Sequence, residues 1–430
     1  MKKYNSYKDS GIEWMGVIPS NWKLIKNRYG FQKHKNGKNE SDDTSVLSLT
    51  IKGVKVKTNL NFGKSTESYI GHQLVEEGDI VFTPRDFDQT PILSDVSKYN
   101  GCISNLYIVD KTKEDVLNHY VNYYWYGLKY SVDYFKNFSH GMRYSFNRFQ
   151  FDEIPLLKPT LSEQQQIVSY LDTKTSLIDS LIEKTQRKIE LLKEKRTTLI
   201  NEVVTKGLNP NVEMKDSGVE WIGEIPNHWE LPRLNNLGDF SKGKGITKDK
   251  IKESGHKCIR CGEIYTTYEL RFNETNSFID DETSRESVFG FKGVLLLTGD
   301  GESLEEMGKC VVYEGEEELY IGGGINVFTP KQEKVIPIYL SYVMSSESVI
   351  FQKSRQGKGE IVVHIYSKQL KEIRLGLPPL TEQQQIVEYL DKQTGLIDKT
   401  ISIEEKRIEL LKEYRQSLIS EVVTGKRKVV

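Results

Sequence analysis

The sequence predicts an α/β (α+β) protein in which two mixed α/β domains are separated by two long coiled-coil helices. Three observations support this prediction: an internal repeat, a sustained heptad pattern at the end of each repeat, and short β-like runs between glycine-rich turns. The chain has 430 residues, which are too many for one compact domain. We therefore predict a domain at 1–158, a long helix at 159–206, a domain with its linker at 207–378, and a second long helix at 379–430.

Two stretches of the chain occur twice, an opening motif and a tail. The opening motif at residues 8–22 (KDSGIEWMGVIPSNW) matches residues 215–229 (KDSGVEWIGEIPNHW) at 10 of 15 positions. The tail at residues 161–205 matches residues 380–424 at 28 of 45 positions without a gap. The inserts between opening motif and tail share little sequence. The chain is therefore a duplication in which a frame of opening motif and tail is repeated while the inserts differ.

The tails are predicted to be helices that form a coiled coil. Ser162 with Gln165, and Thr381 with Gln384, fit the capping-box pattern of a helix start. From there the seam positions recur at alternating spacings of three and four, as in a coiled coil. The predicted seam contains Leu171, Ile178, Ile182, Ile189, Leu192 and Leu199, and in the second tail Leu390, Ile397, Ile401, Ile408, Leu411 and Leu418. An amphipathic helix packed on its own domain is the alternative, but two matching seams in one chain can cover each other.

The inserts are predicted to be mixed α/β. β-like runs alternate with glycine-rich turns at residues 45–51, 79–83, 106–109, 294–298 and 309–313. A helix is predicted in equivalent places of the two inserts, at 119–129 and 338–346. We expect the tyrosines of these helices and Trp125 to lie in the core rather than to form a stacking platform.

Composition limits the classes of protein to which the chain can belong. Only 37% of residues are apolar, and no run approaches the roughly 20 apolar residues of a membrane span. The first ten residues lack the apolar core of a secretory signal, and four cysteines do not suggest a disulfide framework. We therefore expect a soluble, cytoplasmic protein.

Motifs that would indicate catalysis are missing or incomplete. An adenine methyltransferase needs an [N/D/S]PP[Y/F]-type loop, which does not occur. The segment 238–244 begins like a phosphate-binding loop but continues with Gly245, not with a hydroxyl residue. Cys258 and Cys261 have C-x₂-C spacing, but two further zinc ligands at similar spacing are lacking. We expect no catalytic residue, no bound cofactor and no metal site, which argues against a nuclease or methyltransferase in its own right.

Basic residues are concentrated in two stretches of the chain. The chain has 60 basic and 61 acidic residues, yet residues 26–64 hold nine Lys or Arg against three acidic residues, and residues 242–260 hold seven against two. A basic cluster near the start of each insert favours a phosphate-contacting surface over a generic solvated lysine face. A coiled-coil scaffold without DNA contact is a further alternative. The candidate DNA-binding residues are Lys52, Lys55, Lys57, Arg85, His140, Arg143 and Tyr144 in the first insert, and Lys242, Lys244, Arg260, Lys358 and His364 in the second.

The repeated motifs resemble one family. The two W-x-G-x-I-P-x-x-W opening motifs and the two E-Q-Q-Q-I-V-x-Y-L-D tails resemble those of the DNA-specificity (S) subunit of type I restriction-modification systems. Further likenesses occur at residues 75–86 (VEEGDIVFTPRD), 259–270 (IRCGEIYTTYEL) and 297–310 (LLLTGDGESLEEMGKC). The resemblance covers essentially the whole chain, from about Lys8 to about Thr424.

The resemblance implies a division of labour among subunits. The inserts would be target-recognition domains, each reading one half of a bipartite, asymmetric target in double-stranded DNA. The tails would pair antiparallel, with pseudo-two-fold symmetry, as a spacer and as a docking surface for two methyltransferase subunits. Those subunits would carry S-adenosylmethionine, and separate restriction and translocase subunits would carry ATP and Mg²⁺. The recognition subunit of a related methyltransferase-nuclease without a translocating motor stays open as an alternative, because the difference lies in the partner.

Overall fold

The computed structural model describes residues 3–32, 37–58, 68–85, 92–132, 134–135, 145, 147–301, 308–356 and 363–429. Four predicted DNA-binding residues, His140, Arg143, Tyr144 and Lys358, lie outside the described residues. The chain forms two compact units: unit 1 comprises residues 1–186 and 404–430, and unit 2 comprises residues 187–403. Each unit contains one opening motif, one insert and a part of both long helices. The boundaries of the units therefore fall within the long helices and not at their ends.

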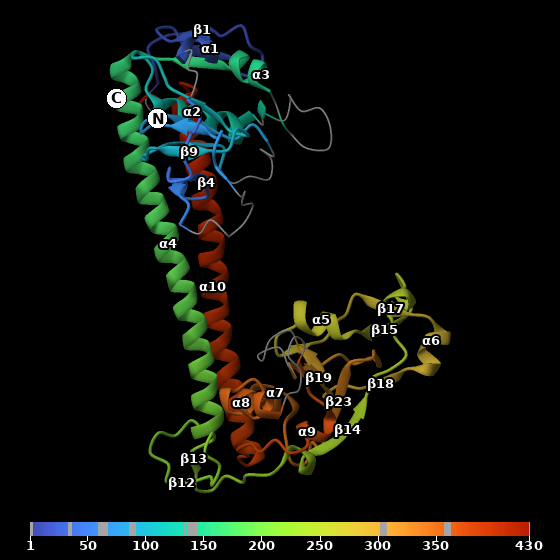
Figure 1. Ribbon diagram of the computed structural model, residues 1–430. Coiled ribbons are helices and arrows are strands. Elements are labelled where there is room, and N and C mark those ends of the chain that lie inside the picture. The colour runs from blue at the N-terminus through green and yellow to red at the C-terminus, as the bar shows by residue number, and fades with distance from the viewer. Residues whose placement is uncertain are drawn as a thin grey trace. The chain divides into compact units, whose positions relative to one another are not determined.

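The two tails are long helices, and each is one continuous element in Figure 1. They are α4 (Leu161–Lys206) and α10 (Leu380–Val423). The predicted capping boxes are wrong, because both helices begin one residue before Ser162 and Thr381. The hydroxyl of Thr160 accepts a hydrogen bond from the backbone N–H of Glu163 at 3.3 Å. This Thr-x-x-Glu pattern begins two residues before the predicted Ser-x-x-Gln pattern. It supplies the hydrogen-bond acceptor for a backbone N–H in the first turn of α4.

The long helices run antiparallel within each unit. In unit 1, an ion pair of 2.9 Å joins Asp179 of α4 to Arg415 of α10, while the start of α4 lies near the last residues of the chain. In unit 2, Arg196 pairs with Asp398 at 2.9 Å, while the end of α4 lies near the start of α10. Eight of the predicted seam residues are buried, namely Leu171, Ile178, Ile189, Leu390, Ile397, Ile401, Ile408 and Leu418. The other four, Ile182, Leu192, Leu199 and Leu411, are half-buried.

Unit 1 is built from short antiparallel strand pairs and one longer helix. Its strands are β1 (Tyr7–Asp9), β2 (Val17–Pro19), β3 (Lys23–Lys26), β4 (Leu47–Thr50), β5 (Gly53–Val56), β6 (Gln73–Val75), β7 (Ile80–Phe82), β8 (Ser94–Val96), β9 (Gly101–Ile103), β10 (Ile108–Asp110) and β11 (Pro155–Lys158). Besides parts of the two long helices it contains α1 (Asn27–Gly30), α2 (Asn118–Val132) and α3 (Arg148–Glu153), of which α2 is the longest. β10, β7 and β8 form a three-stranded sheet in that order. The strands predicted at 45–51, 79–83 and 106–109 and the helix at 119–129 are confirmed.

Unit 2 has two larger sheets. Its strands are β12 (Met214–Asp216), β13 (Glu224–Pro226), β14 (Gly238–Lys242), β15 (His256–Ile259), β16 (Arg271–Phe272), β17 (Ser277–Ile279), β18 (Val288–Gly290), β19 (Leu295–Thr298), β20 (Asp300–Gly301), β21 (Cys310–Tyr313), β22 (Leu319–Ile321), β23 (Ile325–Pro330) and β24 (Val363–His364). Its helices are η2 (Leu234–Asn236), η3 (Lys248–Lys250), α5 (Cys261–Thr266), α6 (Asp281–Glu286), α7 (Pro337–Met344), α8 (Glu347–Gln356) and α9 (Ser367–Leu370). The sheets have the orders β14-β23-β19-β21-β16 and β17-β15-β22-β18. The strands predicted at 294–298 and 309–313 and the helix at 338–346 are confirmed, and so is the α/β (α+β) class.

The inserts share a three-stranded core although their sequences differ. In unit 1 the buried strand β7 pairs antiparallel with β8 and β10. In unit 2 the buried strand β19 pairs antiparallel with β21 and β23, in the same chain order. A strand that is covered on both faces needs only apolar side chains of suitable volume, so different sequences can build the same core.

An aromatic helix and a buried glutamine join each insert to its tail. Tyr120, Tyr124 and Trp125 of α2 are buried, which confirms their predicted place in the core. The buried side chain of Gln164 in α4 accepts a hydrogen bond from the backbone N–H that opens α2, and that of Gln383 in α10 does the same ahead of α7. The frame is therefore repeated in three dimensions, down to single hydrogen bonds. Among the described residues, no helix has the length and apolar character of a membrane span.

Candidate nucleic-acid interface

The basic stretch at residues 242–260 is largely neutralised by carboxylates from other parts of unit 2. The paired side chains are Lys250 with Glu286, Lys252 with Asp280, His256 with Asp281, and Lys257 with Glu274 and Glu317. Lys242, Lys244 and Lys248 are exposed, and no carboxylate among the described residues forms an ion pair with them. The positive charge that remains available to a ligand lies on β14 and the loop that follows it.

The hairpin β4–β5 presents the exposed candidates of unit 1. Lys52 lies in its turn and Lys55 on β5, and both side chains are exposed, whereas Lys57 is half-buried. The Asp95 carboxylate accepts a hydrogen bond of 2.8 Å from the backbone N–H of Val54 and so fixes the hairpin to β8. The hairpin can therefore hold two cations in place for a polyanion.

At the start of the first basic stretch the cations are already paired. Lys26 and Arg28 form ion pairs of 2.5 and 2.8 Å with Glu153 of α3. As in unit 2, part of the local surplus of basic residues serves the structure of the insert.

Two candidates belong to equivalent strand contacts at the end of the buried central strand, Arg85 on the side of that strand and His364 on the opposite side. Arg85, three residues after β7, forms a backbone bridge with Ser145, which precedes α3. In unit 2, Asp300, two residues after β19, pairs with His364, which precedes α9. Both inserts thus bring the segment before a short helix against the end of the central strand, and they place Arg85 and His364 there.

The backbone of the glycine-rich segment 321–324 brings the candidates of unit 2 together. The N–H of Lys244 donates to the Ile321 carbonyl at 3.0 Å, and the N–H of Gly322 donates to the carbonyl of Ile259, the residue before Arg260, at 2.9 Å. The first bond draws in the segment after β14, and the second draws in the end of β15.

Gly299 links the same segment to Ile365, the residue that follows His364. The N–H of Gly299 donates to the Gly324 carbonyl at 2.8 Å, and the N–H of Ile365 donates to the Gly299 carbonyl at 2.8 Å. The approach is close enough that a Cβ at Gly243 would lie 2.1 Å from the Gly322 carbonyl oxygen. Candidates that are far apart in the sequence therefore border one small region of unit 2.

The candidate Arg260 already has a carboxylate neighbour, Glu263. Its Nε lies 3.5 Å from an oxygen of Glu263, and its backbone N–H donates to the same oxygen at 2.8 Å. A DNA phosphate would have to compete with this carboxylate.

Tyr366 was missed by sequence reasoning. It lies between His364 and α9 and its side chain is 51% exposed. The Nζ of Lys242 lies 5.6 Å from the centre of its ring, and the His364 ring lies nearly parallel to it, at 16°. The sequence signal was the short spacing between His364 and Tyr366, but only the pairing of β14 with β23 brings Lys242 to them.

The two cysteines of the C-x₂-C motif lie in different surroundings. Burial raises the pKa of Cys258 to about 12. The Sγ of Cys261 lies 3.6 Å from the Gly324 carbonyl oxygen, to which it donates a weak hydrogen bond. Among the described residues, no group of three His, Cys, Asp or Glu side chains could hold a metal ion.

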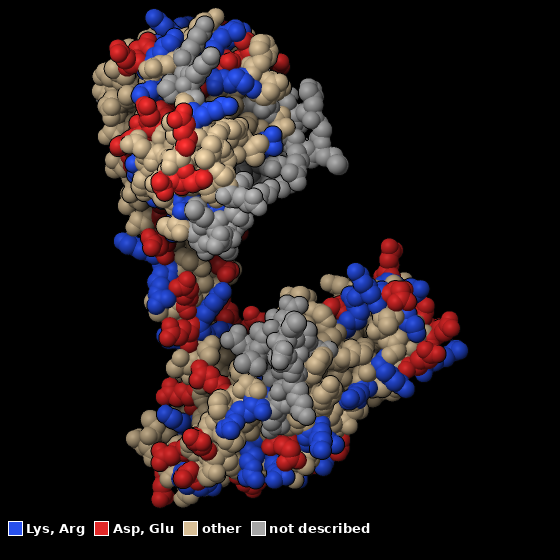
Figure 2. Space-filling model, in the orientation of Figure 1, with Lys and Arg blue, Asp and Glu red and all other residues tan. Residues whose placement is uncertain are grey.

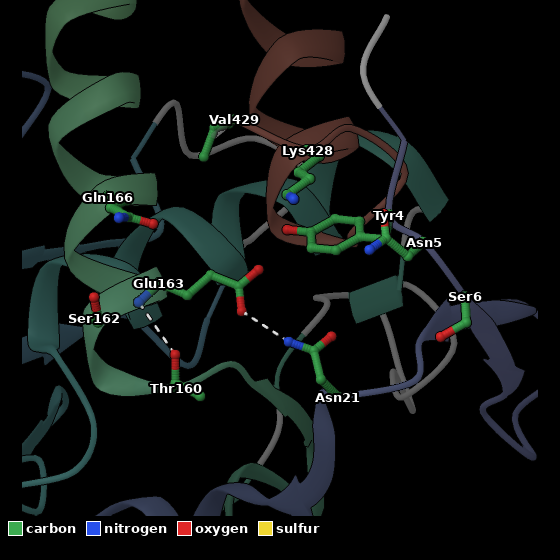
Figure 3. A pocket seen from close by; sticks show the side chains of 10 residues that line it. All are labelled: Tyr4, Asn5, Ser6, Asn21, Thr160, Ser162, Glu163, Gln166, Lys428 and Val429. Atoms are coloured by element: carbon green, nitrogen blue, oxygen red, sulfur yellow. Dashed lines mark hydrogen bonds between the residues drawn. The ribbon is translucent and has the colours of Figure 1, made fainter.

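A polar pocket of unit 1 lies at the junction of opening motif and tail (Figure 3). The Glu163 carboxylate accepts a hydrogen bond from Asn21 at 3.3 Å, next to the Thr160 cap. Burial and the Glu163 carboxylate raise the pKa of Tyr4, whose ring lines the same pocket. The other residues around it are Asn5, Ser6, Ser162, Gln166, Lys428 and Val429.

Unit 2 repeats the contact at this junction. The Glu382 carboxylate lies 2.7 Å from His228 Nε2 and accepts a hydrogen bond from Trp229 Nε1 at 3.2 Å. The acid at this position therefore fixes the opening motif to the tail in both repeats, and we assign the pocket to the frame.

Charges of both signs are interspersed on the face drawn in Figure 2. Neither unit shows one broad basic surface there, in keeping with the net charge of −1. On this face a polyanion would meet separate cations and not one continuous basic surface.

Comparisons with known proteins agree with this architecture. The chain matches the family described as type I restriction modification DNA specificity domain over residues 24–191 and 226–413. It is 27% identical over 286 residues to the type I restriction enzyme MjaVIII specificity subunit of Methanocaldococcus jannaschii, covering 65% of this chain and 63% of that protein. The match thus spans less than two thirds of the relative's length.

Two solved structures share the fold. A chain from a structure on complex assembly and conformational transition of the type I R-M system is 14% identical, with a TM-score of 0.70 over 94% of this chain and 98% of that chain. The HsdS subunit from Thermoanaerobacter tengcongensis is 15% identical, with a TM-score of 0.54 over 97% of this chain and all of that chain (100%). Since the matched residues cover nearly all of both inserts and most of both tails, the chain belongs to the type I restriction modification DNA specificity domain family.

Proposed function

We propose that this protein is the specificity subunit of a type I restriction-modification complex and recognises a bipartite, asymmetric target in double-stranded DNA. The observation that carries the proposal is the repeated frame with dissimilar inserts. Two different half-targets require two different recognition surfaces, whereas two copies of one partner require the same surface twice. The unpaired lysines and the candidates at the ends of β7 and β19 support DNA contact by both inserts.

The outer face of each tail supports docking of two methyltransferase subunits. Tyr170 and Leu177 of α4 recur at the 219-residue offset as Tyr389 and Leu396 of α10. The exposed fractions of the two leucines are 55% and 56%, which is high for residues of this type. The two residues of each Tyr–Leu pair are seven apart, so they lie on one side of their helix. Each pair forms an apolar stripe against which a second amphipathic helix can pack.

The opposite side of each tail faces the insert. The hydroxyl of Tyr123 donates to Asp172 at 2.8 Å, and that of Tyr342 donates to Asp391 at 2.7 Å. Each aspartate follows the stripe tyrosine by two residues, about 200° around the helix axis. Leu177 and Leu396 are therefore exposed to a partner in both units, whereas the Tyr170 ring is partly covered because it packs against the hydrophobic core of unit 1.

The chemistry is assigned to the partners. In this proposal the chain is not an enzyme: it positions two methyltransferase subunits, which hold S-adenosylmethionine and methylate adenine. Restriction and translocase subunits hold ATP and Mg²⁺, and the complex acts in the cytoplasm. The incomplete motifs in the sequence support this division.

The test of DNA recognition is an exchange of one insert. Residues 23–158 are replaced by the insert of a relative with a different methylation motif, and adenine methylation is mapped by sequencing in cells with the cognate partner subunits. One half of the motif should change while the other half and its orientation stay the same. If both halves change together, or neither changes, independent reading by the two inserts is wrong.

The test of docking uses the two stripes. Leu177→Glu and Leu396→Glu should each remove one methyltransferase subunit, because a buried carboxylate without a partner costs several kcal/mol. The mass of the purified complex gives the number of bound subunits. Ser176→Glu and Lys392→Glu, at exposed positions outside the stripes, are the matched controls. Two subunits bound to the Leu177→Glu, Leu396→Glu double variant would exclude this surface.

A further inference from the structure

We propose that Tyr366 is a base-contacting residue of unit 2 and forms one recognition centre with Lys242 and His364. This inference rests on the proposed function, since it names residues of the second recognition domain that determine its half of the target.

The three side chains lie beside one another, with Lys242 and Tyr366 exposed and His364 half-buried. The Tyr366 ring is 51% exposed, with the Lys242 ammonium 5.6 Å from its centre. The centroids of the His364 and Tyr366 rings are 6.3 Å apart, with 16° between their planes. A cation over an aromatic face gains electrostatic attraction, so the ring keeps the lysine above it in place.

One asparagine side chain fixes the segment that contains Tyr366. Asn326 of β23 is the cross-strand partner of Lys242, its side chain accepts a hydrogen bond from Ser367 Oγ at 2.7 Å, and it donates to the Ile365 carbonyl at 3.4 Å. The residues on both sides of Tyr366 are therefore anchored without its ring. Because none of these contacts involves the Tyr366 ring, the exposed ring is not needed to anchor the segment.

The chemistry of the centre fits a DNA base. Contact between an aromatic ring and a base contributes about 1–3 kcal/mol in nucleic-acid complexes. A lysine beside the ring can donate to O6 and N7 of guanine in the major groove, and Lys242 has no carboxylate partner among the described residues that would have to be displaced.

The equivalent position in unit 1 has a different role. Asn147 lies 219 residues before Tyr366, directly ahead of α3, and its side chain accepts a hydrogen bond from the backbone N–H of Gln150 at 3.0 Å. One repeat thus uses this position to cap a helix, and the other exposes an aromatic ring. A residue that reads one half of an asymmetric target is expected to differ between the repeats.

The experiment compares variants of the full chain in complex with its methyltransferase subunits. Tyr366→Ala and Tyr366→Phe are assayed by methylation of genomic DNA, which reports both halves of the motif at once. Phe291→Ala, which removes another exposed aromatic ring of unit 2, is the matched control. Tyr366→Ala should lower methylation of the original motif by about 5- to 150-fold and relax one position in the unit 2 half. The unit 1 half should stay unchanged.

Tyr366→Phe should restore the motif, because the ring is retained. Lys242→Met should relax one position of the same half rather than weaken methylation of all sequences alike. The proposal is overturned if Tyr366→Ala methylates the original motif at the rate of Phe291→Ala, or if Tyr366→Phe behaves like Tyr366→Ala. In either case the proposed function would stand, since it is tested separately by exchange of a whole insert and fails there if both halves of the motif change together or neither changes.

Discussion

Replacing Gln383 by methionine should destabilise unit 2 by about 2–4 kcal/mol. The side chain is fully buried, and its Oε1 accepts a hydrogen bond from the Ile336 N–H at 2.8 Å. Its Nε2 donates to the carbonyls of Lys334 and Pro378 at 3.0 and 2.9 Å. Methionine matches glutamine in length and helix propensity but makes none of these bonds. Each lost bond costs about 1 kcal/mol, and the orphaned N–H adds to this cost.

The repeat supplies a second, independent copy of the experiment. Gln164 accepts a hydrogen bond from the Leu117 N–H at 2.8 Å and donates to the carbonyls of Asp115 and Pro159 at 3.1 and 3.0 Å. Gln164→Met should therefore destabilise unit 1 by a similar amount. The effect should be confined to the unit that carries the substitution, because each glutamine bonds only within its own unit.

The assay is urea unfolding with hydrogen exchange resolved by segment, since a chain with two units need not unfold in one step. With a slope of about 3 kcal/mol per molar urea, a loss of about 3 kcal/mol lowers the midpoint by about 1 M. The controls are Gln166→Met and Gln385→Met, exposed neighbours in the same Gln-Gln-Gln runs, which should change stability by less than about 0.5 kcal/mol. If Gln383→Met unfolds at the same urea concentration as Gln385→Met, the buried hydrogen bonds of Gln383 do not stabilise the contact between insert and tail.

Three further predictions concern a buried lysine, a helical glycine and the hairpin lysines. Burial lowers the pKa of Lys353 from 10.5 to about 8, so between these pH values the unfolded state binds more protons and the free energy of unfolding of unit 2 should rise with pH, by at most about 3 kcal/mol. Denaturation across this window should show no such rise for Lys353→Met. Gly395→Ala should raise the thermal stability of unit 2 by up to about 1 kcal/mol, because the glycine is inside α10 and a Cβ would meet no atom within 4 Å; a lower melting temperature would contradict this. Changing Lys52 and Lys55 together to Gln should reduce the salt dependence of DNA binding by the complex by about two phosphate contacts, whereas Lys250→Gln, whose parent lysine is already paired, should leave the slope unchanged.

The sequence by itself determined the duplication, because the chain matches itself at a fixed offset, and the long helices with their seam, because these depend on local periodicity. The helix starts were misplaced, since Ser162 and Thr160 both begin a plausible cap and only the observed hydrogen bond to Glu163 distinguishes them. The β-like runs and the aromatic helices were also predictable, because short apolar stretches between turns are local signals as well.

Only the tertiary structure decided which polar residues are available for function. Each Gln-Gln-Gln run contains one buried glutamine, Gln164 or Gln383, and the choice depends on the backbone of a helix more than 40 residues away in the chain. The basic stretch at 242–260 loses much of its free charge to carboxylates such as Glu286, which strand pairing brings to it. The same long-range pairing sets Tyr366 beside Lys242, 124 residues apart in the chain (366 minus 242). Residue types are written in the sequence, but the partners of buried and charged groups follow from contacts between distant segments, which local patterns do not contain.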